Sequence, residues 1–253
     1  MRGVLDVCGC FPTGRHYPGI ADRLRRAIVA VRGLAKHLSP ESRWATSRLA
    51  IIDFETTGLS PETDRILEVG IACFHAGELT NLKHWLVNPG MPIPEPARAV
   101  HGIGDAEVAD APTFVQIAVE LTQLLRDHVP VAYNASFDRA FFHAELERAG
   151  LPTSGGEDMP AACSSEVDWL DPLVWVRELY RDDKSRKLTD IAARLGIALE
   201  RAHRAASDAE TTGRVLLALA DRMPPSYGEV IGLQGQYAAR QEIDLQWRPG
   251  RRN

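Results

Sequence analysis

The sequence predicts an α/β protein with a mixed central β-sheet flanked by helices. Two observations favour this class: three strand-like segments come first in the chain, and helical and strand-like segments alternate after them. The chain has 253 residues, enough for one large domain with extensions. Its composition, 45% hydrophobic and 25% charged, is that of a globular protein and excludes a disordered or collagen-like chain.

The predicted strands are short apolar segments bounded by turns and by a proline-rich loop. The first of them has the sequence RLAIIDF, and its paired isoleucines are typical of a buried strand. The four predicted strands span residues 48–54, 66–74, 82–87 and 129–133.

Predicted helices begin at residues that cap a helix and end at glycine or proline. Thr113 and Gln116 form a capping box at the start of one helix. Ser136 is expected to cap a second helix, which ends at Gly150, and Ser207 is expected to cap a third. Two further helices are expected at residues 170–180 and 188–195.

Charge divides the chain into a basic N-terminal segment and an acidic body. The net charge is −5, yet residues 1–46 carry eight Lys and Arg against three Asp and Glu, and the remainder carries 21 against 31. We expect a basic extension over residues 1–43, a main domain over 44–224 and a polar tail over 225–253. Carboxylates gathered at one point of the body would indicate bound metal rather than direct contact with phosphate.

The extension contains one helical pattern. Apolar residues from Ile20 to Leu38 recur every three or four positions, and arginines lie mostly off that line. Such a helix either packs on the main domain or offers a basic surface to nucleic acid or a partner protein.

Membrane insertion and secretion are not expected. No apolar run approaches the length of about 18 residues that a membrane helix needs, and the N-terminus shows no secretory leader pattern. The four cysteines form neither a disulfide framework nor a zinc-ligand spacing. A reducing, cytoplasmic location is therefore the expected one.

Three acidic segments lie where predicted strands end or helices begin. Asp53 and Glu55 end the first strand and, two residues apart, point to the same face. Asp138 falls in the first turn of a helix, where the helix dipole alone would favour an acid. Asp208 begins another helix on its buried face, and His203 lies in the preceding loop, where a surface histidine would be equally ordinary.

Considered together, these segments predict a metal site. Four carboxylates in one pocket of low dielectric constant could not all be ionised without positive charge nearby. Oxygen ligands without cysteine favour Mg²⁺ or Mn²⁺, and two such ions side by side are used to cleave phosphodiester bonds.

The same segments resemble the three motifs of the DEDDh 3′–5′ exonucleases, a family that includes the epsilon proofreading subunit of DNA polymerase III and its stand-alone homologues. The resemblance covers roughly residues 46–222 and implies a ribonuclease H-like fold for the main domain. His101-Gly102-Ile103 resembles a further short segment of that family. The matching motifs are Asp53-Phe54-Glu55-Thr56-Thr57-Gly58-Leu59, Asn134-Ala135-Ser136-Phe137-Asp138 and His203-Arg204-Ala205-Ala206-Ser207-Asp208-Ala209.

The resemblance also implies roles for individual residues. His203 would be the general base, a role that suits imidazole because it ionises near neutral pH. Two Mg²⁺ or Mn²⁺ ions would be held by four carboxylates, of which Asp53 would bridge both: Asp53, Glu55, Asp138 and Asp208. The terminal nucleotide would bind near four other residues: Thr57, Leu59, His101 and Phe137. A core position for Phe137 and a loop-stabilising hydrogen bond for His101 stay open as alternatives.

The function implied is a metal-dependent 3′–5′ exonuclease that acts in proofreading or repair on the 3′ end of DNA, either single-stranded or frayed, and releases nucleoside 5′-monophosphates. Trimming of RNA 3′ ends is an alternative, because the same fold serves both substrates. A third possibility is a replisome subunit in which binding to a replicative polymerase or sliding clamp matters more than cleavage. The segment Glu242–Trp247 loosely resembles a clamp-binding peptide, although an incidental apolar segment is the plainer explanation.

Overall fold

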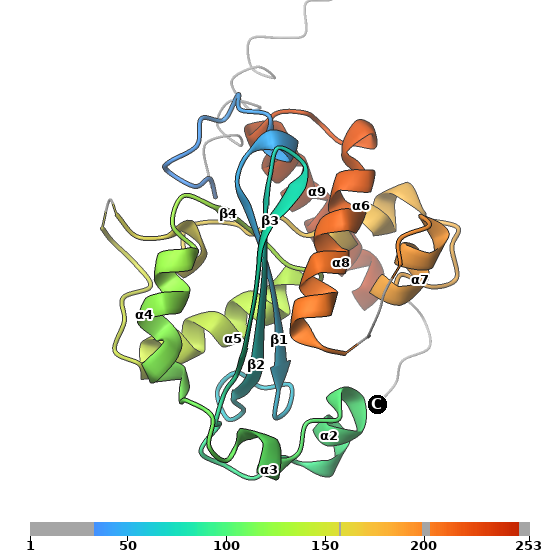
Figure 1. Ribbon diagram of the computed structural model, residues 1–253. Helices are drawn as coiled ribbons and strands as arrows, with labels where there is room; N and C mark the ends of the chain where they lie inside the picture. Colours follow the sequence, from blue (N-terminus) through green and yellow to red (C-terminus); the bar gives the residue numbers. More distant parts are fainter. Residues whose placement is uncertain (1–32, 157, 199–202, 248–253) are drawn as a thin grey trace, which may run out of the picture.

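The computed structural model describes residues 33–156, 158–198 and 203–247. A four-stranded sheet stands between two layers of helices (Figure 1). The strands lie in the order β3-β2-β1-β4; β1 pairs antiparallel with β2 and parallel with β4, so the predicted mixed sheet is confirmed. Their bounds are Leu49–Thr56 for β1, Ile66–His75 for β2, Glu78–Leu86 for β3 and Val129–Val131 for β4.

Of the helices in the described residues, two cover one face of the sheet and four lie on the other (Figure 1). The first layer contains α4 (Phe114–Leu124) and α5 (Ala135–Arg148). The second contains α6 (Pro172–Leu179), α7 (Leu188–Arg194), α8 (Ala205–Ala218) and α9 (Tyr227–Gln246). The short helices α2 (Glu95–His101) and α3 (Asp105–Val108) lie beyond the end of β1, and 3₁₀ turns occupy Trp44–Thr46, Ala161–Cys163 and Ala220–Arg222. Among the described residues, none of the helices has the length and apolar character to cross a lipid bilayer.

The alternation of side chains along β1 divides the core into two parts. Leu49 and Ile51 pack with α8 and α9, whereas Ile52 and Phe54 pack with α4 and α5. Continuing the first series places Asp53 and Glu55 on the α8 face, as the sequence predicts.

A glycine in β2 brings α8 unusually close to the sheet. Gly70 pairs with Asp53 in the antiparallel register of β1 and β2. A Cβ atom added at Gly70 would overlap the backbone of Ala205 and Ala206 in the first turn of α8. The first turn of this helix therefore lies directly on the strand, next to Asp53.

Two helices begin earlier than predicted, because carboxylates from other elements accept their first N–H groups. Ser136 does not cap α5; the helix follows Asn134, and Asp171 accepts hydrogen bonds from the N–H groups of Asn134 and Ala135, both at 3.0 Å. Ser207 does not cap α8, which begins at Ala205, whose N–H donates to a buried glutamate of β2 at 3.1 Å. In neither helix does the serine side chain supply the cap.

Residues 227–246 form helix α9 rather than a polar tail. Tyr227 and Val230 are buried in the core, and the Tyr227 hydroxyl accepts a hydrogen bond from the Ala35 N–H at 3.0 Å. The buried Gln234 side chain accepts from the Asp171 N–H and donates to the Trp169 carbonyl. Glutamines in such buried positions make the segment look polar in sequence although one face packs on the core. The division of the chain into domains stays a prediction.

The helix predicted from Ile20 to Leu38 lies mostly outside the described residues. The described part, residues 33–38, is not helical. Gly33 has a φ of +77° and forms a β-bridge with Val167, and its carbonyl accepts from the Asp168 N–H at 2.8 Å. The end of the predicted extension therefore packs on the main body.

We predict that Gly70→Ala destabilises the protein by roughly 1–3 kcal/mol or more, because the new methyl group overlaps helix backbone that cannot move alone. Urea unfolding would measure the change in the free energy of unfolding. Gly235→Ala in α9 is the matched control: it meets open space and should be neutral or stabilising by up to about 1 kcal/mol. Equal stability of the two variants would contradict the close packing of α8 on β2.

Candidate active site

The site begins where β1 extends beyond its parallel neighbour. β4 ends at Val131, which pairs with Ile51, so the Phe54 N–H on that edge has no strand beside it. The Asp138 carboxylate, in the first turn of α5, accepts a hydrogen bond from this N–H at 3.1 Å. This bond brings the buried Asp138 next to the end of β1 that carries Asp53 and Glu55.

The first turn of α8 brings the third acidic segment to the same place. Asp208 is partly buried and accepts a hydrogen bond from the His203 N–H at 2.9 Å. His203 is exposed and has a left-handed backbone, with φ of +62°. One ligand atom from each of Glu55, His203 and Asp208 lies within 4.8 Å of the other two. The three acidic segments, which are distant in sequence, thus bring their predicted site residues together at the end of β1.

Burial raises the pKa of every carboxyl group in this cluster, and nearby carboxylates add to the rise. Burial raises the pKa of Asp53 well above its ordinary value, and the neighbouring carboxylates raise it further. The pKa of Glu55 rises to about 8, again mainly through burial, with Arg204 as a partial offset. Burial likewise raises the pKa of Asp138 and of Asp208, against the hydrogen bonds that each accepts from a backbone N–H.

These raised pKa values fit a cation site. A positive ion among the four carboxylates would remove the repulsion and allow all of them to ionise. The donors are carboxylate oxygens with one imidazole beside them, and no cysteine lies in the group, a set that suits Mg²⁺ or Mn²⁺. That the ions are held by Asp53, Glu55, Asp138 and Asp208 stays a prediction.

Two buried carboxylates that support this cluster were not predicted. Glu68 on β2 pairs with Glu55 in register and is 1% exposed. Asp171 is buried between the start of α5 and the start of α6, where it accepts from the Leu173 N–H at 2.8 Å. The sequence holds one signal for Glu68, a lone charge inside the apolar segment Ile66–Phe74.

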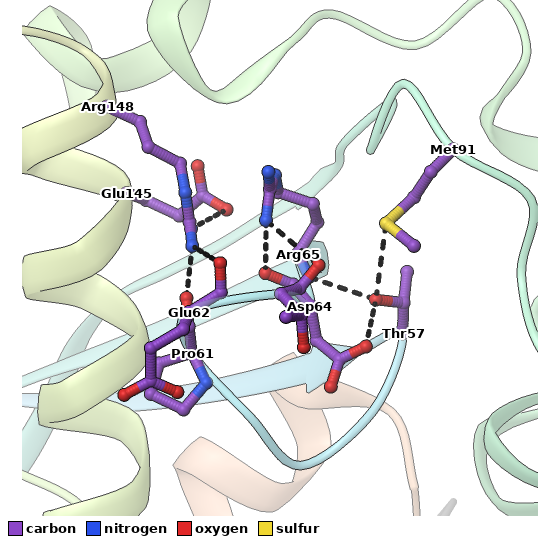
Figure 2. Close-up of polar contacts among 9 residues, drawn as sticks. Thr57, Pro61, Glu62, Asp64, Arg65, Met91, Glu145 and Arg148 are labelled. Carbon is purple, nitrogen blue, oxygen red and sulfur yellow. Dashed lines mark hydrogen bonds and ion pairs between the residues drawn. The ribbon is translucent and has the colours of Figure 1, made fainter.

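Hydrogen bonds hold the loop that follows β1 (Figure 2). Leu59 in this loop is 86% exposed. Thr57, predicted to lie near the substrate, is buried; its hydroxyl accepts from the Arg65 N–H at 2.9 Å and donates to Asp64 at 3.3 Å. Arg148 of α5 donates to the carbonyl oxygens of Pro61 and Glu62 and pairs with Glu145. The loop is thereby tied to α5 and presents Leu59 to solvent.

The other two predicted substrate residues, His101 and Phe137, both make contacts within the protein, and His101 also has a ring nitrogen without a partner among the described residues. His101 is buried, and its Nδ1 accepts a hydrogen bond from the Ile103 N–H at 3.0 Å, the loop contact foreseen as an alternative. Its Nε2 is also buried and has no hydrogen-bond partner among the described residues. Phe137 is partly buried against the α4–α5 core, with its ring centroid 4.9 Å from that of Phe141.

Comparison with known proteins shows the family. Residues 50–216 match the RNase T model, described as an exonuclease, and the chain belongs to this exonuclease family. A DNA polymerase III PolC-type of Streptococcus suis is 34% identical over 166 residues, which cover 66% of this chain and 11% of that protein. The same protein of Streptococcus pneumoniae is 33% identical over 178 residues, 70% of this chain. The chain thus spans about a tenth of the length of these curated relatives.

Solved structures agree with this assignment. Exonuclease X in complex with 5′ overhanging duplex DNA aligns with a TM-score of 0.57 and 25% identity, covering 74% of this chain and 99% of that one. The nuclease domain of 3′hExo, a DEDDh family member bound to rAMP, has a TM-score of 0.57 and 17% identity over 70% of this chain and 93% of that one, which shows the shared fold. The predicted ribonuclease H-like fold and DEDDh resemblance are confirmed.

The metal-free protein should lose stability as the pH rises. The folded-state pKa of Glu55 is about 8 against an ordinary value of 4.5, so between these values the folded state keeps a proton that the unfolded state has lost. The stability that this proton confers is complete below the lower value and is lost as the pH rises through the higher one. Thermal unfolding in EDTA between about pH 5 and pH 9 would measure this trend.

Asp53→Asn should raise the unfolding temperature of the metal-free protein, because it removes one repelling carboxylate. In the unchanged protein, Mn²⁺ at about 100 times its Kd should stabilise the folded state by about 2.7 kcal/mol, or roughly 5–10 °C in unfolding temperature. The variant should lose most of this gain.

Glu178→Gln is the control. The Glu178 pKa is lowered to about 2 by its arginine and glutamine partners, so that variant should be less stable and keep the response to Mn²⁺. A Mn²⁺ response that survives Asp53→Asn would contradict the site.

Proposed function

We propose that the protein is a metal-dependent 3′–5′ exonuclease that removes nucleoside 5′-monophosphates from the 3′ end of DNA. The observation that carries the proposal is the convergence of four carboxylates with raised pKa values beside an exposed histidine. Membership of the exonuclease family supports hydrolysis of a phosphodiester bond.

The proposed roles follow from the placement of the side chains. Divalent cations held by Asp53, Glu55, Asp138 and Asp208 would supply the Lewis-acid chemistry for cleavage of a phosphodiester bond. His203 would take a proton at a ring nitrogen from the water that attacks the phosphorus, since it is exposed beside two of these carboxylates. The bond to the 3′ oxygen of the preceding nucleotide would break, which leaves a new 3′ hydroxyl on the strand.

We place the substrate side of the site at the β1–β2 loop and α2, the elements that carry the predicted substrate residues Thr57, Leu59 and His101. Leu59 offers an exposed apolar side chain on a loop that hydrogen bonds hold in place, suited to contact with an unpaired base. The unpartnered Nε2 of His101 is a buried polar group that a bound nucleotide could satisfy. Thr57 would act through the shape of the loop, because its hydroxyl bonds within it.

DNA is favoured as the substrate by the relatives. Those with 33–34% identity are named as DNA polymerases, and exonuclease X was solved with duplex DNA. We also propose that the protein proofreads in association with a replicative polymerase, because the matching relatives are much longer DNA polymerases. Binding to a sliding clamp stays a prediction; Ile243, near the end of α9, is 57% exposed, and Trp247, just after the helix, is 83% exposed.

A nuclease assay tests the proposal. A 5′-labelled single strand should shorten from its 3′ end in Mg²⁺ or Mn²⁺, EDTA should stop the reaction, and a matched RNA strand should be cleaved more slowly. Asp53→Ala should abolish activity. His203→Ala should lower kcat by about 10²–10⁴-fold, because proton transfer is lost while the carboxylates stay.

His75→Ala is the matched control, since His75 is exposed at the far end of β2 and should leave the rate unchanged. Full activity of His203→Ala would exclude the general-base role. Cleavage that proceeds equally in EDTA would exclude the metal-dependent proposal, and faster cleavage of RNA would exclude the DNA preference.

A further inference from the structure

Glu68 is the most deeply buried acidic side chain among the described residues, and none of the exonuclease motifs includes it. It is 1% exposed in the middle of the sheet and pairs with Glu55 in the antiparallel register of β1 and β2. Residues paired in this way point to the same face, so the two carboxylates lie side by side beneath the first turn of α8. A second carboxylate here adds to the repulsion that Glu55 experiences.

Three N–H groups donate to the Glu68 carboxylate, and the His84 ring lies within hydrogen-bond distance of it. Arg204 donates from Nε at 3.0 Å and from Nη2 at 2.8 Å to Oε1, and the Ala205 N–H donates to Oε2 at 3.1 Å. His84 on β3 places Nε2 at 2.5 Å from Oε1. Since both oxygens are engaged by donors, Glu68 is occupied in holding neighbouring residues and is not left free as a ligand.

The residues that Glu68 holds connect His203 to Asp208. Arg204 follows His203 directly, and Ala205 is the first residue of α8, the helix whose first turn carries Asp208. His203 has a left-handed backbone conformation, and its N–H donates a hydrogen bond to the Asp208 carboxylate. A contact that fixes Arg204 and Ala205 on β2 therefore also fixes the positions of His203 before them and Asp208 after them.

We propose that Glu68 is a positioning residue for the active site: through Arg204 and the Ala205 N–H it holds the His203 loop and the first turn of α8 against β2. This inference rests on the proposed exonuclease function, for which His203 and Asp208 act on the substrate. Gly70, two residues further along the same face of β2, supplies the space for the close approach.

The test compares variants that change either the length or the charge of the Glu68 side chain. Glu68→Asp keeps the negative charge but shortens the side chain, so it should no longer reach Arg204 and Ala205 together. Glu68→Gln keeps the length but replaces one acceptor oxygen by a donor. Both should lower kcat by about 10²-fold with KM within about twofold, because a displacement of about 1 Å suffices for such a loss. Arg204→Ala, at a partly exposed site, should lower kcat similarly without altering a buried carboxylate.

Amide hydrogen exchange in EDTA supplies a readout that does not depend on cleavage. The N–H groups of residues 205–208 should exchange at least about tenfold faster in the Glu68 and Arg204 variants, while the N–H groups of α9 should be unchanged. Glu178→Gln is the matched control: Glu178 is likewise a mostly buried glutamate with arginine partners, but it lies on α6 against α9. It should leave kcat and the exchange at residues 205–208 unchanged.

The outcomes separate this inference from the proposed function. If the unchanged protein cleaves no 3′ end, the function fails, whereas faster exchange at residues 205–208 in the variants would still support the positioning contact. If the unchanged protein cleaves and Glu68→Asp matches it in kcat and exchange, charge rather than reach is what matters and the inference is overturned. Unchanged exchange in all three variants would overturn it equally.

Discussion

Repulsion among carboxylates that share one poorly solvated place is the constraint on which the structure of this site depends. Asp53 and Glu55 on β1, Asp138 on α5 and Asp208 on α8 all have raised pKa values, with burial as the largest cause. Such a cluster costs stability in a metal-free protein when its carboxyl groups are ionised, and either protonation or an ion of opposite charge removes the cost. The arrangement is suited to the proposed cation site.

The surrounding residues hold the cluster together against this repulsion. Asp171 fixes the start of α5 and Glu68 fixes the start of α8, so each helix that carries a site carboxylate is anchored by a second, buried carboxylate from another element. Arg204 has two roles: it forms an ion pair with Glu68, and its positive charge lowers the pKa of the site carboxylate Glu55. Gly70 removes the side chain that would keep α8 at an ordinary distance.

Local patterns predicted the strands and the face on which Asp53 and Glu55 lie, because side-chain alternation needs only the neighbouring residues. They did not predict Glu68 or Gly70, whose roles depend on the register of β2 against β1. The starts of α5 and α8 were misplaced at Ser136 and Ser207 because the acceptors that cap them are distant in sequence. The α9 helix was missed because its buried glutamines bond to the core and hide the apolar period.

The central claim, that this carboxylate cluster is a cation site, is tested most directly by counting protons released on binding. Calorimetric titration of the metal-free protein with Mn²⁺ at neutral pH, in buffers of different ionisation enthalpy, measures that number. The account predicts net release, because the ion displaces protons held by carboxyl groups with raised pKa values, and predicts that release fades well above the value of about 8 for Glu55. Binding without proton release at neutral pH, or no binding at millimolar Mn²⁺, would contradict it.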